Sequence, residues 1–115
     1  PQGLVRRQVS RFPAVEPLLD EFARVESALA DPGVHGRPDE ARRLGRRYAQ
    51  LRAVAEAYRA WRSAADDLDT ARELADEDAG LRAELPALTA AEESAAAVLA
   101  ELLAPRDPDD DRDAI

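Results

Sequence analysis

The sequence RRYAQLRAVAEAYRAWRSAADDLDTARELADEDA, residues 46–79, contains neither glycine nor proline and consists mainly of strong helix formers. An unbroken helix of this length would measure roughly 50 Å, because an α-helix rises about 1.5 Å per residue. The apolar residues recur at spacings of three, four or their sums, which places them on one face of a helix. A stripe this narrow predicts one or two partner helices. The residues on the stripe are Tyr48, Leu51, Ala55, Tyr58, Ala65, Leu68 and Leu74.

The composition favours an all-α fold. Of the 115 residues, 45% are hydrophobic but only 4% are aromatic, and alanine supplies much of the hydrophobic share. Because strand-forming residues are scarce, we expect one elongated domain, an antiparallel helical bundle or coiled-coil hairpin of three main helical segments. No membrane-spanning apolar run and no signal peptide can be recognised, so we expect a cytoplasmic protein without a membrane partner. The absence of cysteine excludes disulfides, thiolate metal sites and a cysteine nucleophile.

The residues before the central stretch predict one helix and a loop. Residues 1–11 show no periodicity, so we expect a disordered leader or cloning remnant there and place the helical domain at residues 12–104. The helical period predicts a first helix over residues 14–30, ended by the breaker Asp31-Pro32-Gly33. Asp39 is the expected N-cap of the next helix, since its carboxylate can accept hydrogen bonds from free backbone N–H groups.

Three features predict interruptions in the later helices. The apolar stripe shifts phase near Leu51 and Val54, which predicts a kink or break there. Gly80 is expected to end the central helix. Pro86 removes a helical hydrogen bond, so we expect a kink or break before it, with residues 81–85 as a separate short turn.

The last helical region is expected to end before Pro105, followed by an acidic linker over residues 105–115. Its apolar residues follow the helical period and are expected to continue the bundle. They are Leu85, Leu88, Ala91, Ala95, Val98, Leu99, Leu102 and Leu103.

Charge is divided unevenly along the chain, whose net charge is −8. Twelve arginines and eight acidic residues lie in residues 1–62, whereas four arginines and sixteen acidic residues follow. Four arginines form two adjacent rows on a helix, because residues four apart are neighbours on its surface. These rows could contact nucleic-acid phosphates without reading sequence, or could be a solvated face paired with nearby acidic residues. The four are Arg42, Arg43, Arg46 and Arg47.

No other motif predicts catalysis or metal binding. His35 lies in a Gly/Pro loop without a nucleophile in a triad-like context, which favours a solvated side chain. Residues 107–113 resemble a calcium loop only superficially, since Arg112 stands where that loop needs glycine. Trp61 lies on the apolar stripe, so core packing is favoured over base stacking.

The closing run LLAPRDPDDDRDAI, residues 102–115, resembles the linker that ends the N-terminal helical domain in the bacterial peptide chain release factor 1 family. In that family a similar Leu-Leu-x-Pro run, followed by alternating basic and acidic residues, precedes the decoding and catalytic part. Similar runs also occur upstream, and the order and spacing agree from Phe12 to Ile115. These upstream runs are RYAQL at 47–51, YRAW at 58–61 and DDLDTA at 66–71.

The resemblance implies the first domain of a factor that recognises UAA and UAG stop codons on the ribosome and triggers hydrolysis of peptidyl-tRNA. The codon-reading Pro-x-Thr and the Gly-Gly-Gln motif of the family belong to later domains and do not occur in this sequence. The fragment is therefore expected to be a docking module, not an enzyme, and to need no cofactor. The implied partners are the large-subunit stalk base with its rRNA, a class II release factor and the release-factor glutamine methyltransferase.

The residues leave an alternative function open. A heptad-like stripe rich in alanine is also typical of a coiled-coil adaptor that associates with itself. Under any of these functions, the fragment could form a dimer through an exposed part of the stripe, since a truncated protein can leave apolar surface uncovered.

Overall fold

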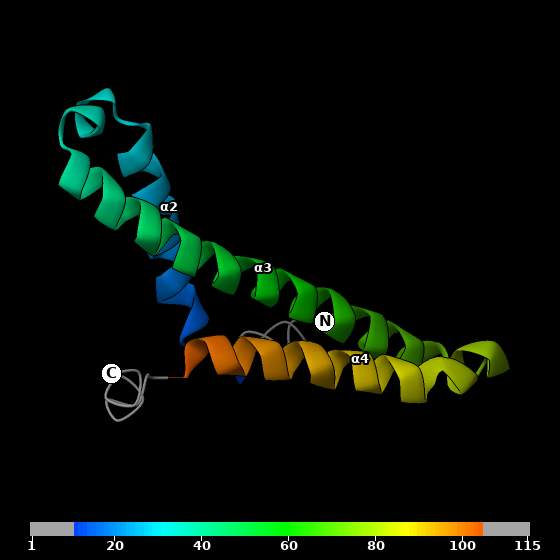
Figure 1. Ribbon diagram of the computed structural model, residues 1–115. Coiled ribbons are helices and arrows are strands. Elements are labelled where there is room, and N and C mark those ends of the chain that lie inside the picture. The colour runs from blue at the N-terminus through cyan, green and yellow to red at the C-terminus, as the bar shows by residue number, and fades with distance from the viewer. Residues whose placement is uncertain (1–10, 105–115) are drawn as a thin grey trace, which may run out of the picture.

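The computed structural model describes residues 11–104, which contain helices and no strand. The helix α3 (Pro38–Leu74) is the longest, and it packs against both α2 (Val15–Ala30) and α4 (Ala79–Leu103). A short 3-10 helix, η1 (Pro32–Gly36), connects α2 to α3. Figure 1 shows α2 crossing the first half of α3, while α4 runs back along its second half. The predicted all-α, elongated hairpin of three helical segments is confirmed.

The molecule is far from spherical. Its extents are 61 × 38 × 22 Å and its radius of gyration is 18.8 Å, whereas a compact domain of this size has a radius of about 13 Å. The 37 residues of α3 account for this length, because such a helix measures about 55 Å.

The first helix lies where the sequence predicts it, beginning one residue later than expected and ending at Ala30. Its last turn gives way to η1 at Asp31, whose side chain accepts a hydrogen bond from the Gly33 backbone N–H at 2.9 Å. The prediction that Asp39 caps the next helix is wrong. Pro38 already opens α3, and a proline is well suited to this position because its missing N–H would have no partner there.

The helix α3 runs without a break past Leu51 and Val54, so the break that was one form of the predicted interruption is wrong. Leu51, Val54 and Ala55 are all buried. A helix with partners on two sides must bury a wider arc than a single stripe. The phase shift in the sequence therefore reflects the two partners of α3.

The turn between α3 and α4 is held by side chains. The carboxylate of Asp78 accepts hydrogen bonds from the backbone N–H groups of Gly80 at 2.9 Å and Leu81 at 3.2 Å. Arg82 donates from Nε and Nη2 to the carbonyl oxygen of Ala75, at 3.1 and 2.9 Å. Gly80 therefore lies in the first turn of α4, and the prediction that it ends the central helix is wrong.

The predicted break at Pro86 is also wrong, because α4 is continuous from Ala79 to Leu103. Pro86 is exposed. On the solvent side of a helix, the carbonyl that loses its N–H donor to a proline can be hydrated instead.

The main core lies where all three helices meet. Trp61 is 2% exposed and Leu99 is fully buried. Leu74, Val98 and Leu102 were expected to face the bundle, but they are 45%, 54% and 44% exposed. The buried residues of the core cluster are Val15, Val54, Trp61, Ala65, Ala96 and Leu99.

Candidate functional site

The four arginines near the start of α3 differ in whether they pair with an acidic residue. Arg47 donates to Glu21 of α2 through two hydrogen bonds, Nε to Oε2 and Nη2 to Oε1, each 2.6 Å long. Its Nη1 also donates to the side chain of Gln50 at 3.2 Å. Such a bidentate pair fixes the guanidinium. Arg47 therefore ties α2 to α3.

The Arg47–Glu21 pair changes the protonation of both groups. The hydrogen bonds from Arg47 lower the pKa of the Glu21 carboxyl below its ordinary value. The same hydrogen bonds raise the pKa of Arg47. Both shifts favour the charged forms, as expected for a hydrogen-bonded ion pair.

The other three arginines point away from the helix contacts. Arg42 forms an ion pair with Asp39, one turn earlier on the same helix. Arg43 and Arg46 are exposed and form no ion pair with another residue between 11 and 104. They lie three positions apart, so they share one face of α3. The structure thus brings together a smaller basic surface than the sequence predicts.

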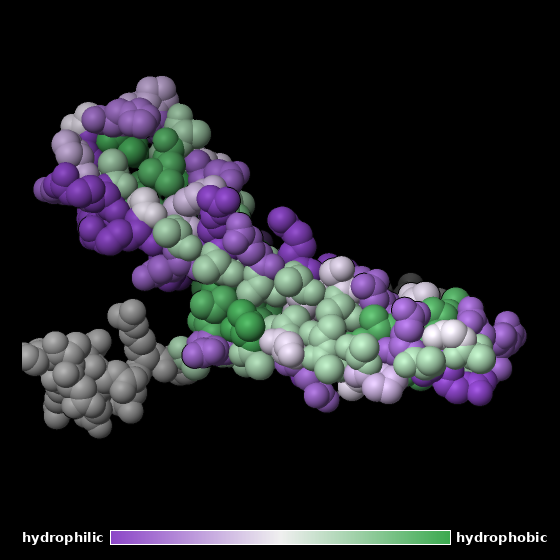
Figure 2. All heavy atoms as spheres, turned by 45° about the vertical axis from the view of Figure 1, so that its right-hand side comes forward, coloured by the Kyte–Doolittle hydropathy of each residue, from purple (hydrophilic) through white to green (hydrophobic). Residues whose placement is uncertain are grey.

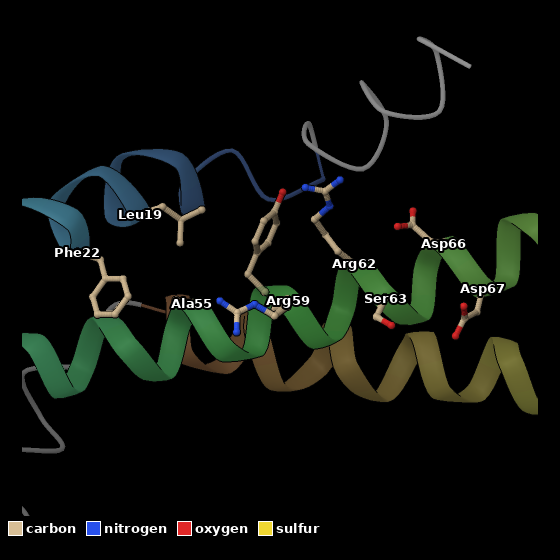
Figure 3. Close-up of a pocket in the computed structure, with 9 residues that line it drawn as sticks. Leu19, Phe22, Ala55, Arg59, Arg62, Ser63, Asp66 and Asp67 are labelled. Carbon is tan, nitrogen blue, oxygen red and sulfur yellow. The ribbon is translucent and has the colours of Figure 1, made fainter. Parts of the chain in front are cut away.

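A groove of 670 Å³ lies between α2 and α3. Leu19 and Phe22 of α2 line one end, together with Ala55 of α3, and charged side chains line the rest with Tyr58 and Ser63 (Figure 3). The guanidinium of Arg62 lies 5.9 Å from the centroid of the Tyr58 ring. The volume falls within the range of about 300–1,000 Å³ found for small-ligand sites. The charged residues of the groove are Arg59, Arg62, Asp66 and Asp67.

A buried polar contact joins α3 to α4 beside the core. The indole Nε1–H of Trp61 donates to Oε2 of Glu92 at 2.7 Å, and Glu92 is only 8% exposed. Arg11 forms an ion pair with the same carboxylate, and its guanidinium lies over the rings of Phe12 and Trp61, 5.6 and 5.7 Å from their centroids. Arg11, the last residue of the stretch expected to be a leader, thus contacts the helical core.

This contact was missed by sequence reasoning, although a signal existed. Glu92 precedes Ala96 and Leu99 by four and seven positions, so it lies on the buried face of α4. An acidic residue on such a face needs a polar partner. The spacing indicates the need for a partner but does not say that Trp61 and Arg11 supply it.

The remaining predicted residues can be placed briefly. His35 is exposed in η1. Between residues 11 and 104, no group of three or more histidine and acidic side chains could hold a metal ion. Within the same range, no helix has an apolar stretch long enough to cross a lipid bilayer. The calcium-like run at 107–113 and the acidic linker at 105–115 lie outside the described residues.

Comparison with known proteins decides the family. The PCRF domain matches residues 18–115, which include all three described α-helices except the first turn of α2. The chain belongs to the PCRF domain family. The match also covers the linker residues 105–115, on which the resemblance in the sequence rests most strongly. No solved structure matches the chain.

The PCRF chain is similar to curated proteins named peptide chain release factor 1. It is 62% identical to the one from Kineococcus radiotolerans, 53% to that from Acidothermus cellulolyticus and 52% to that from Arthrobacter sp. FB24. Each alignment covers 104 residues, which is 90% of this chain but only 29% of the relative. The chain therefore spans less than a third of the length of these relatives.

Proposed function

We propose that this PCRF chain is the helical domain of a translation termination factor and docks that factor on the ribosome, at the stalk base of the large subunit. The observation that carries the proposal is the identity of 52–62% to peptide chain release factor 1 over 90% of the chain. An elongated helical shape, 61 Å in its longest dimension, suits a module that spans from one contact to another.

The full-length factor would recognise UAA and UAG codons and trigger hydrolysis of peptidyl-tRNA in the cytoplasm. These activities follow from the release factor resemblance. They would reside in the part of the polypeptide outside these 115 residues, whose family motifs are absent from this sequence. A class II release factor and the release-factor glutamine methyltransferase are the further partners of the whole factor in this proposal.

Arg43 and Arg46 are the residues proposed to contact rRNA, with Arg42 beside them. Arg43 and Arg46 are exposed at the end of the molecule where α2, η1 and α3 meet. An arginine without an acidic partner can pair with a phosphate at a smaller desolvation cost than one already paired. The acidic second half of the chain would be repelled by RNA, so this end is the one that faces it.

Competition with the intact factor tests docking directly. The 115-residue chain should bind isolated large subunits at low salt and inhibit peptide release by the full-length factor in a concentration-dependent way. If it neither binds nor inhibits, the docking function is wrong.

A pair of variants tests the contact surface. Replacing both Arg43 and Arg46 with glutamine should weaken subunit binding and reduce the slope of log affinity against log salt by about 1 for each phosphate that an arginine no longer neutralises. The matched control replaces Arg52 and Arg72, which are exposed elsewhere on α3, and should keep the original slope. Equal slopes for both double variants would exclude a role for Arg43 and Arg46.

A self-associating adaptor is the second candidate, and the exposed Val98 and Leu102 favour it. The predicted stripe of α3 does not, because Leu51, Trp61 and Leu68 are buried within the single chain. Sedimentation equilibrium separates the two functions. A monomer over the accessible concentration range would remove the adaptor.

A further inference from the structure

The face of α3 that packs against α2 continues along the helix beyond the position where α2 begins. Residues on this face recur at spacings of three and four positions, which keeps them on one side of the helix. The first part lies beside α2, where the ring centroids of Tyr48 and Phe22 are 5.1 Å apart. The part that follows is charged. We refer to it as the distal α3 face: Arg62, Asp66, Asp69 and Glu73.

The distal α3 face points to the same side as α2. Figure 3 shows Arg62 and Asp66 projecting from α3 toward the side where α2 lies and away from α4. Both residues are exposed, and both line the groove of 670 Å³ between α2 and α3. Figure 2 shows hydrophilic residues along the upper edge of the lower arm, where α3 lies. The distal α3 face therefore offers charge, not apolar surface, to whatever covers it.

The chain approaches this face from the beginning of α2, because α2 and α3 run antiparallel. The ring centroids of Phe12 and Trp61 are 4.8 Å apart. Between the Phe22–Tyr48 contact and this one, the chain moves ten positions back along α2 and thirteen positions forward along α3. The guanidinium of Arg11 lies 5.7 Å from the centroid of the Trp61 ring. The residues before Arg11 therefore start at the near end of the distal α3 face.

The segment before Arg11 is long enough to reach the acidic residues of this face. Asp66 and Asp69 lie about 7.5 and 12 Å beyond Trp61 along the helix axis. The four positions from Arg11 back to Arg7 span about 6 Å in a helix and up to about 13 Å when extended. Either conformation brings the backbone of residue 7 close to the level of Asp66.

The charges of the segment and of this part of α3 are opposite. Residues 1–11 contain three arginines and no acidic residue. Residues 63–78, which hold the second half of α3 and the turn after it, contain seven acidic residues and one arginine. Complementary charge of this kind favours pairing of two surfaces and fixes their register.

We infer that residues 6–10 of this chain dock along the distal α3 face, with Arg6 and Arg7 paired with Asp66 and Asp69. Covalent linkage through Arg11 gives the segment a high effective concentration at this face. The family match begins at residue 18, so the inference rests on this chain's own residues. It does not depend on ribosome docking. The segment and the Arg47–Glu21 pair would then hold α2 against α3 from both of its ends.

Carbodiimide cross-linking tests this contact, because the sequence contains no lysine. Arg7→Lys keeps the charge and adds a single side-chain amine, which the reagent joins only to a carboxylate in contact with it. We expect mass spectrometry to find this amine joined to Asp66 or Asp69 of the same chain. The yield should be at least fivefold higher than for Asp67, which is exposed, adjacent in sequence and on another face of α3. The matched control Arg43→Lys should give no cross-link to Asp66 or Asp69.

Three results would overturn the inference. One is the absence of cross-links from residue 7 to Asp66 and Asp69. Another is an equal yield for Asp66 and Asp67, which would mean that the basic segment contacts α3 without a preferred face. The third is a cross-link that forms only between two chains and increases with concentration, which would assign the face to the segment of a second copy.

Trypsin digestion checks the contact with Arg7 in place, because trypsin cleaves after arginine. The double variant Asp66→Asn, Asp69→Asn should be cleaved after Arg7 at least threefold faster than the original chain, since the segment has lost its partners. The control Asp67→Asn, Asp76→Asn removes the same charge from exposed positions outside the distal α3 face and should leave the rate unchanged. Equal rates for the two double variants would also contradict the inference.

Discussion

Replacement of Trp61 by phenylalanine tests the polar contact that joins α3 to α4. The indole N–H donates to a Glu92 carboxylate that is only 8% exposed, at 2.7 Å, and a phenyl ring has no donor. Loss of a hydrogen bond to a buried charged group costs about 1–3 kcal/mol. The smaller ring leaves a cavity that adds about 1 kcal/mol. We therefore expect Trp61→Phe to lower the free energy of unfolding by about 2–4 kcal/mol.

Urea unfolding of the 115-residue chain at neutral pH, followed by far-ultraviolet circular dichroism, measures this change. The midpoint should fall at an unchanged slope, because the surface exposed on unfolding stays nearly the same. For a domain of this size, the loss corresponds to a melting temperature lower by roughly 10–20 °C.

The control is the double variant Trp61→Phe, Glu92→Leu. It removes the carboxylate that in Trp61→Phe would lose its indole donor and keep only Arg11, and Arg11 can turn to water because its side chain is 47% exposed. The double variant should therefore be less destabilised than the sum of the two single variants by about 1–3 kcal/mol. Strict additivity of the two substitutions, or a loss below about 1 kcal/mol for Trp61→Phe, would refute the reasoning.

Three further predictions concern single residues. Leu99→Ala should lower the unfolding free energy by about 3–5 kcal/mol, since Leu99 is fully buried in the core; a loss below about 1.5 kcal/mol in urea unfolding would contradict this. Pro86→Ala should raise it by about 1–3 kcal/mol, because α4 is continuous there and gains a hydrogen bond; an unchanged midpoint would contradict it. Glu21→Gln should make the free energy of unfolding less dependent on pH in the acid range. The pKa of Glu21 is lowered in the folded chain, so its ion pair with Arg47 stabilises the fold fully above the unfolded pKa of about 4.3, and this stabilisation is lost as pH falls through the lower folded pKa. Identical pH profiles for wild type and Glu21→Gln would contradict the assignment.

The ends of a helix could be predicted from the sequence where they depend only on the residues at that position. The Asp31-Pro32-Gly33 breaker ends α2 as expected, because these residues disfavour helix whatever surrounds them. Pro86 misled the prediction, since the effect of a proline depends on whether the freed carbonyl faces water or protein. The phase shift near Val54 was interpreted as a kink or break, and the break was wrong because a single stripe cannot show that a helix has two partners.

The candidate site was less accessible to sequence reasoning for a related reason. The spacing of Arg43, Arg46 and Arg47 correctly placed them near one another, but it could not show that Glu21, 26 positions away from Arg47, would engage only that one. Pairing across helices depends on how α2 crosses α3. Likewise, the exposure of Val98 and Leu102 could not be predicted from a pattern that they share with the buried Leu99.

The arrangement of the helices has a consequence for the order of folding. Each α-helix packs chiefly on its neighbour in sequence, which gives low contact order and predicts folding within milliseconds or faster. The contact between Arg11 and Glu92 joins residues 81 positions apart. Closing so long a loop is entropically expensive before the helices have come together. The Arg11 end should therefore dock last during folding and detach first during unfolding, so amide exchange near Phe12 should be faster than at Trp61.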